Sequence, residues 1–89
     1  MTDEQVIETI NQSLAEEFEL DPDRMRPQAH LVDDLEFDSL DFVDMVVTLQ
    51  KAFGVKLREE PRVREVRTLG DLHQLIIDKR RQMEAASED

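Results

Sequence analysis

The sequence predicts an all-α protein, a small antiparallel four-helix bundle with three longer helices, a short third helix and a long loop between the first two. Apolar residues recur at helical spacing in several stretches, runs of alternating β-branched residues are few, and the chain has only two glycines. With 89 residues the chain has the size of one small domain. We place this domain at residues 1–84 and expect residues 85–89 to form a flexible tail.

The first helix is predicted over residues 3–18. Its apolar residues form a single stripe at helical spacing, made of Val6, Ile7, Ile10, Leu14 and Phe18. Thr2 and Gln5 have the spacing of a capping box, which marks the start of a helix.

A long loop is predicted over residues 19–37, because Pro22 and Pro27 interrupt any helix there. Loops of this length are uncommon in compact domains unless they are functional. We expect four apolar residues to fasten it to the core: Leu31, Val32, Leu35 and Phe37.

The second helix is predicted over residues 39–53, with Asp38 as its N-cap and Gly54 just beyond its end. Its apolar residues cover more than half of the circumference: Leu40, Phe42, Val43, Met45, Val46, Val47, Leu49 and Phe53. Either this helix is central in the bundle, or part of its apolar surface awaits a partner.

A short helix or turn is predicted around residues 59–65, where Pro61 lies. The last helix follows Thr68, whose spacing to Asp71 is typical of an N-cap, and is expected to end near residue 83. Its inward residues are expected to be Leu69, Leu72, Ile76 and Met83.

The formal net charge of −11 is concentrated in the first half of the chain. Residues 1–45 carry 14 acids and two arginines, a net of −12, whereas residues 46–89 carry eight acids and nine bases, a net of +1. Such acidity argues against nucleic acid as a partner and favours a basic protein surface. No apolar run approaches the roughly 20 residues of a membrane span, and the acidic N-terminus is unlike a secretory signal, so we expect a cytoplasmic protein.

The stretch DLEFDSLDF, residues 34–42, surrounds one serine with carboxylates at the start of a helix. Catalysis by Ser39 would need a histidine base held by a third group, and a domain this small has little room for an enclosed pocket, so we expect no enzyme. A calcium loop beginning at Asp34 fails, because Ser39 stands where glycine is required and Met45 where glutamate is required. Two further roles are that Asp38 and Ser39 merely cap the helix and that Ser39 is a substrate, since a phosphoryl group on a helix N-terminal serine is favoured by the helix dipole.

The 33–57 segment DDLEFDSLDFVDMVVTLQKAFGVKL resembles the acyl carrier protein family. The family's Asp-Ser-Leu triplet matches residues 38–40, its acidic lead-in matches residues 32–35, and VRTLGDL at residues 66–72 resembles the start of the family's last helix. The resemblance covers nearly the whole chain.

This resemblance implies that Ser39 receives 4′-phosphopantetheine from coenzyme A through a phosphopantetheinyl transferase. The thiol of that arm would carry acyl groups as thioesters, and the chain itself, expected to be a monomer, would catalyse nothing. The helix over 39–53 would dock acyl-transferring and chain-elongating or modifying enzymes that have basic surfaces. The contact surface would consist of Asp38, Leu40, Asp41, Val43, Asp44 and Val47.

The chain departs from the family between Leu35 and Asp38, where Glu36 stands in place of the usual glycine. Because glutamate has poor access to positive φ, we expect the loop to take a different path there, and we expect Phe37 to be an exposed or half-buried ring. The segment around the third helix is unusually basic, with Arg58, Arg62, Arg64 and Arg67.

Three functions remain open. The first is a discrete acyl carrier for fatty-acid, polyketide or related synthesis, and the basic segment favours a dedicated carrier over neutral variation on a solvated surface. The second is a peptidyl or aminoacyl carrier, and the third is an unmodified acidic docking protein of the same fold.

Overall fold

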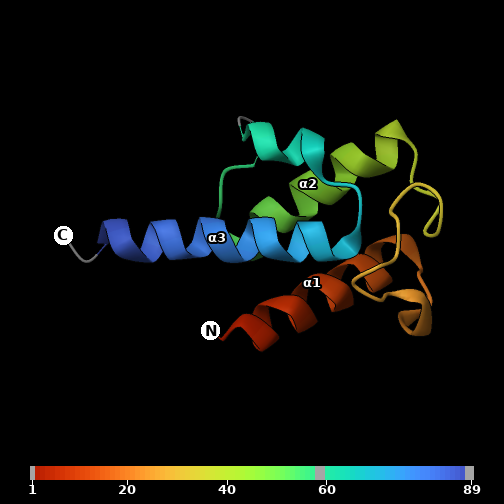
Figure 1. Ribbon diagram of the computed structural model, residues 1–89, viewed down its shortest axis with the longest axis horizontal. Coiled ribbons are helices and arrows are strands. Elements are labelled where there is room, and N and C mark those ends of the chain that lie inside the picture. Colours follow the sequence, from red (N-terminus) through yellow and green to blue (C-terminus); the bar gives the residue numbers. More distant parts are fainter. Residues whose placement is uncertain (1, 58–59, 88–89) are drawn as a thin grey trace.

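Three α-helices make up the protein in the computed structural model, which describes residues 2–57 and 60–87, the last four without their side chains. They are α1 (Asp3–Phe18), α2 (Ser39–Phe53) and α3 (Leu69–Ser87). Two short 3-10 helices, η1 (Pro22–Arg24) and η2 (Pro61–Glu65), lie in the connections. α1 packs against both α2 and α3, and η2 packs on α3 (Figure 1). The predicted all-α class is confirmed.

The predicted four-helix bundle is not confirmed, because the segment expected to form the third helix is the 3-10 helix η2. Its backbone bonds span three residues, from Val63 N–H to the Glu60 carbonyl and from Val66 N–H to the Val63 carbonyl. Two ion pairs hold this segment to α3, between Arg62 and Asp78 at 2.9 Å and between Lys79 and Glu60 at 3.2 Å. Residues 58 and 59, where that segment was expected to begin, lie outside the described part of the chain.

The ends of the helices follow the sequence signals closely. Thr2 and Gln5 form the predicted capping box of α1, and Gly54 closes α2 in the left-handed conformation with φ of 66°. The predicted cap before α3 also forms, because Thr68 and Asp71 exchange side-chain to backbone hydrogen bonds. α3 continues to Ser87, later than the end expected near residue 83.

The core is built from the inward stripes of all three helices and from the two connections. Its fully buried side chains include Ile10, Leu14, Leu31, Met45, Leu49, Leu57, Leu69, Leu72, Leu75 and Ile76. Two expected core residues are instead exposed, Val32 at 56% and Met83 at 46%. Val32 lies in a tight turn whose inward positions are taken by Leu31 and Leu35, and the buried stripe of α3 ends at Ile77.

The wide apolar arc of α2 is divided between the core and the solvent. Met45, Val46, Leu49 and Phe53 are buried, whereas Leu40 and Val43 are exposed. Part of the apolar surface of α2 is therefore left without a partner inside the molecule. Among the described residues, no helix has the length and apolar character needed to cross a bilayer.

Candidate functional site

Ser39 is the first residue of α2 and is exposed to solvent. The helix start is fixed by a reciprocal capping box, which the sequence predicted only in part. The backbone N–H of Asp41 donates to Oδ1 of Asp38 at 2.8 Å, and the N–H of Asp38 donates to Oδ2 of Asp41 at 3.2 Å. Within the described residues the Ser39 hydroxyl has no hydrogen-bond partner, so it is exposed at the helix start without an intramolecular contact.

The backbone before Ser39 turns tightly around the Leu31 region. The N–H groups of Asp34 and Leu35 both donate to the His30 carbonyl, and the N–H of Phe37 donates to the Leu31 carbonyl at 2.9 Å. Glu36 adopts a φ of 60° within this turn. The expectation that glutamate diverts the loop from a left-handed conformation is therefore wrong, because the surrounding hydrogen bonds hold residue 36 there despite its side chain.

Phe37 is buried, with 4% of its surface exposed, so the expectation of an exposed or half-buried ring is also wrong. Its ring packs on that of Phe18, with centroids 4.8 Å apart and planes tilted by 43°. This aromatic contact fastens the residue two positions before Ser39 to the end of α1.

The loop that precedes Ser39 is also fastened to the start of α3. Leu31 N–H donates to the Arg67 carbonyl, Leu69 N–H to the Ala29 carbonyl and Gly70 N–H to the Pro27 carbonyl, each at 2.9 Å. A Cβ on Gly70 would lie 3.0 Å from the Pro27 carbonyl oxygen, a contact tight enough that the backbone at Pro27 would have to shift, so glycine suits this close approach. No local pattern around Gly70 predicts this contact, which joins segments far apart in the chain.

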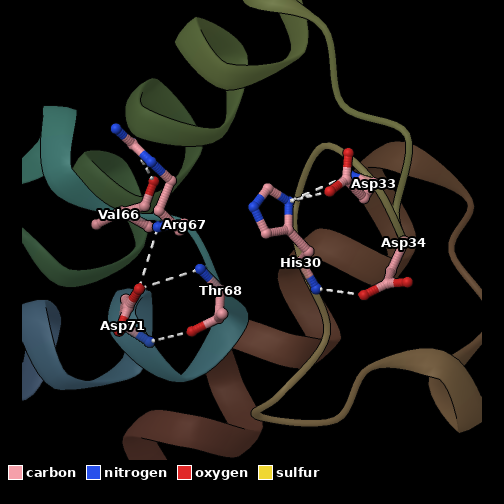
Figure 2. Close-up of polar contacts among 7 residues, drawn as sticks. All are labelled: His30, Asp33, Asp34, Val66, Arg67, Thr68 and Asp71. Carbon is pink, nitrogen blue, oxygen red and sulfur yellow. Dashed lines mark hydrogen bonds and ion pairs between the residues drawn. The ribbon is translucent and has the colours of Figure 1, made fainter.

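Carboxylate groups stabilise both segments at the contact between the loop and the start of α3 (Figure 2). Oδ2 of Asp71 accepts from the N–H groups of Thr68 and Arg67, and these bonds lower the pKa of its carboxyl group. On the loop, Oδ2 of Asp34 accepts from the His30 N–H at 2.7 Å, and Nδ1 of His30 accepts from the Asp33 N–H at 3.2 Å. The base of the site is thus built by local hydrogen bonds from both segments.

An open groove of about 810 Å³ lies beside Ser39. Five apolar residues contribute to it, Leu31, Val32, Phe37, Phe42 and Val66. Its polar lining consists of His30, Asp38, Ser39, Arg64 and Arg67. A free hydroxyl at a helix N-terminus, opening onto a groove with apolar walls, fits a phosphate-linked organic group attached at Ser39.

The expected contact surface lies on α2 beside this hydroxyl. Leu40 is 76% exposed and Val43 is 55% exposed, and Asp38 and Asp44 are also exposed. Asp41 and Val47 are partly buried. Large exposed apolar side chains flanked by carboxylates are typical of a surface that binds another protein.

Each histidine takes part in a hydrogen bond within the fold. His73 is buried on α3, and its Nε2 lies 2.7 Å from Oδ1 of Asn11 on α1. Burial lowers the pKa of the His73 imidazole, so the ring is neutral. In the described residues no group of three or more histidine or acidic side chains is arranged to hold a metal ion.

Comparisons with known proteins agree with this geometry. The chain matches the family described as phosphopantetheine attachment site over residues 8–76. Acyl carrier protein 2 of Ralstonia nicotianae is 39% identical over 72 residues, which cover 81% of this chain and 88% of that protein. The acyl carrier protein of Thermosynechococcus vestitus is 29% identical over 79 residues, covering 89% of this chain and 96% of that protein.

A third relative and a solved structure extend the comparison. Acyl carrier protein AcpXL of Brucella melitensis is 47% identical over 53 residues, which cover 60% of this chain but only 57% of that protein. The structure of an acyl carrier protein from Enterococcus faecalis is similar with a TM-score of 0.71 and 25% identity, covering 89% of this chain and 99% of that one. The family match and the similarity along most of the sequence show that this chain belongs to the phosphopantetheine attachment-site family, among its acyl carrier proteins.

Proposed function

We propose that Ser39 is the residue through which this acyl carrier protein holds its 4′-phosphopantetheine group. The observation that carries the proposal is the exposed, unpartnered hydroxyl of Ser39 at the N-terminus of α2, beside an apolar groove. In the reaction, a phosphopantetheinyl transferase joins Oγ to the phosphorus of the coenzyme A arm, the pyrophosphate bond breaks, and adenosine 3′,5′-bisphosphate leaves. When bound, the group supplies a thiol that carries acyl groups as thioesters.

In this proposal the residues around Ser39 present the attached group to partner enzymes and form the surface that those enzymes recognise. None of them takes part in chemistry on the acyl group. The capping box of Asp38 and Asp41 fixes the hydroxyl at the helix end. The docking surface that we propose consists of Asp38, Leu40, Asp41, Val43, Asp44 and Val47. Exposed Leu40 and Val43 would enter apolar pockets on the partner, while the carboxylates attract its basic side chains.

The partners in this proposal are the transferase and the enzymes that load, elongate or modify the acyl group in fatty-acid, polyketide or related synthesis. The carrier acts as a monomer in the cytoplasm, and residues 1–84 form the carrier domain. The basic residues on and after η2 support a carrier dedicated to its own enzymes, because a basic edge beside the acidic helix changes which partner surfaces are complementary.

Intact-protein mass spectrometry tests the attachment. The protein is incubated with coenzyme A and a phosphopantetheinyl transferase of broad specificity, beside Ser39→Ala and a matched Ser13→Ala variant. We expect the mass of one phosphopantetheine to be added to the wild type and to Ser13→Ala, and none to Ser39→Ala. Modification of Ser39→Ala, or no modification of the wild type by several transferases, would exclude Ser39 as the attachment residue.

A further inference from the structure

Two arginines line the groove that opens beside Ser39. Arg64 belongs to η2, and Arg67 lies in the short connection between η2 and α3. Both are exposed, and both share the groove with Ser39 and Phe42 of α2. The groove therefore has apolar walls, with the Asp38 carboxylate beside Ser39 and two arginines contributed by the segment that runs from η2 to α3.

The Arg67 side chain is held in place by its own backbone surroundings. Its Nη1 donates to the Arg64 carbonyl at 2.9 Å and to the Val66 carbonyl at 3.3 Å. Figure 2 shows this side chain extending away from Thr68 and Asp71, and the Asp71 carboxylate accepts a hydrogen bond only from the Arg67 backbone N–H. A guanidinium has five N–H donors, so most of its donors remain available for an anion.

The Arg64 side chain has no hydrogen bond or ion pair with any residue that the structure describes. Nearby cations on this part of the chain are used differently, since Arg62 is paired with Asp78 and Lys79 with Glu60. Among the described residues of this region, Arg64 and Arg67 are the cations that line the groove.

The acidic residues around Ser39 would favour a nearby cation once the serine is modified. Asp38 and Asp41 cap the helix, and Asp33, Asp34 and Asp44 lie nearby in the sequence. A phosphodiester on Ser39 adds another negative charge beside these carboxylates, which like-charge repulsion disfavours. Guanidinium groups match phosphate oxygens in geometry as well as charge.

We propose that Arg64 and Arg67 form an anion-binding edge that takes the phosphodiester linking the arm to Ser39, a proposal that rests on the attachment at Ser39. The phosphodiester is the favoured anion because it is bonded directly to Oγ, whereas a carboxylate on the cargo would lie at the far end of the arm. Binding there lays the first part of the arm along the apolar walls of Leu31, Phe42 and Val66.

The test compares the protein before and after modification by nuclear magnetic resonance, with intact mass confirming the arm in each sample. The side-chain Nε–Hε signals of Arg64 and Arg67 should shift on modification severalfold more than that of Arg26, which lies on the loop away from this groove. The ³¹P signal of the phosphodiester should move toward its position in the urea-unfolded modified protein in Arg64→Gln and stay unchanged in the matched Arg26→Gln. Arg67→Lys, which keeps the charge but loses the planar fork, should give an intermediate shift.

The experiment distinguishes a failure of this inference from a failure of the attachment at Ser39. A sample with the added mass but unmoved Arg64 and Arg67 signals overturns this inference and leaves the attachment intact. Arginine signals that move only after a carboxylate-bearing acyl group is loaded overturn it as well, and would assign the edge to the cargo. A wild-type protein that gains no mass overturns both proposals together.

Discussion

Glu36 is the residue at which sequence and backbone disagree most clearly. Its φ of 60° lies in the left-handed region, where a side chain is strained and glycine is not. The strain lies three residues before Ser39, in a loop held by hydrogen bonds to the His30 and Leu31 carbonyls. The fold therefore imposes the conformation on a residue that does not favour it.

Glu36→Gly is expected to stabilise the protein. The left-handed conformation costs a non-glycine residue roughly 1–2 kcal/mol, and glycine gives back roughly 0.5–1 kcal/mol through its freer unfolded chain, so we expect a net gain of about 0.5–1 kcal/mol in the free energy of unfolding. Urea denaturation followed by helical circular dichroism measures it. The control Glu8→Gly, in the exposed interior of α1, should lose about 1 kcal/mol. A loss in both variants would show that residue 36 is unstrained.

The positions of other single residues could be predicted only where residues adjacent in the sequence determine them. Asp38 as a cap and Ser39 as an exposed helix-start residue follow from adjacent residues. Phe37 was expected both to fasten the loop to the core and to be an exposed or half-buried ring; the local sequence could not decide between the two, because the outcome depends on a ring contact with Phe18, on a helix that ends before the long loop. A glutamate that holds a left-handed φ is likewise invisible in the sequence, since the hydrogen bonds that impose it come from the folded loop.

At the scale of elements, the start of α2 serves both stability and presentation. Asp38→Ala is expected to lower the free energy of unfolding by about 1 kcal/mol, because the Asp41 N–H loses its acceptor at the helix start. Asp44→Ala, exposed within the helix, should change stability by less than about 0.5 kcal/mol. Thermal or urea unfolding of the two variants gives the comparison, and equal effects would contradict the capping role.

Because Asp38 and Asp41 cap the helix, Asp44 is the better residue for testing electrostatic docking. Asp44→Lys should slow modification by the transferase at low salt, and the difference from wild type should shrink as salt rises, since steering is screened by ions. The rate of mass gain at several salt concentrations measures this. Glu8→Lys makes the same charge change on α1 and should have a smaller effect. Equal slowing by both variants would mean that the transferase responds to the net charge of the protein and not to a specific surface on α2.

The boundaries of α1 and α2 were predictable because short-range signals set them, namely two capping boxes and a left-handed glycine at residue 54. The 3-10 form of residues 61–65 was not, because ion pairs to Asp78 and Lys79, distant in sequence, help to hold that segment. The outward position of Met83 was not predictable either, since helical spacing alone does not show where the neighbouring helices stop covering α3.

At the scale of the whole molecule, His73 and Asn11 join α3 to α1 inside a small core. Burial lowers the pKa of His73, so between its folded value and the unfolded value of about 6.5 the unfolded chain binds more protons. Stability from this group is therefore complete above about pH 6.5 and is lost as the pH falls below it.

The melting temperature of the wild type should accordingly decrease as the pH is lowered from about 7.5 to about 5.5. Most carboxyl groups remain charged over this range. His73→Gln keeps a hydrogen-bonding side chain without this titration and should show a flatter profile over the same range. Parallel profiles for the two proteins would mean that His73 binds protons equally in the folded and unfolded states.

Some features of the whole molecule can be read from local sequence patterns, whereas others arise only when the segments pack together. The acidic first half, the serine triplet and the helical stripes are visible in the sequence; the stripes predicted the all-α class, which is confirmed, and the triplet predicts attachment at Ser39, which stays a prediction. The groove beside Ser39 is not visible, because its walls come from the loop, α2 and the residues on either side of Val66. The presence of Arg64 and Arg67 in that groove is a product of the same packing.

The most direct test of the central claim is to locate the added group within the chain. After modification with coenzyme A and a transferase, the protein is digested and fragmented, and the peptide containing residues 34–42 is sequenced by mass spectrometry. We predict that every fragment containing Ser39 carries the phosphopantetheine mass and that fragments ending at Asp38 do not. The added mass on any other residue would contradict the account, because the site would then lie away from the start of α2.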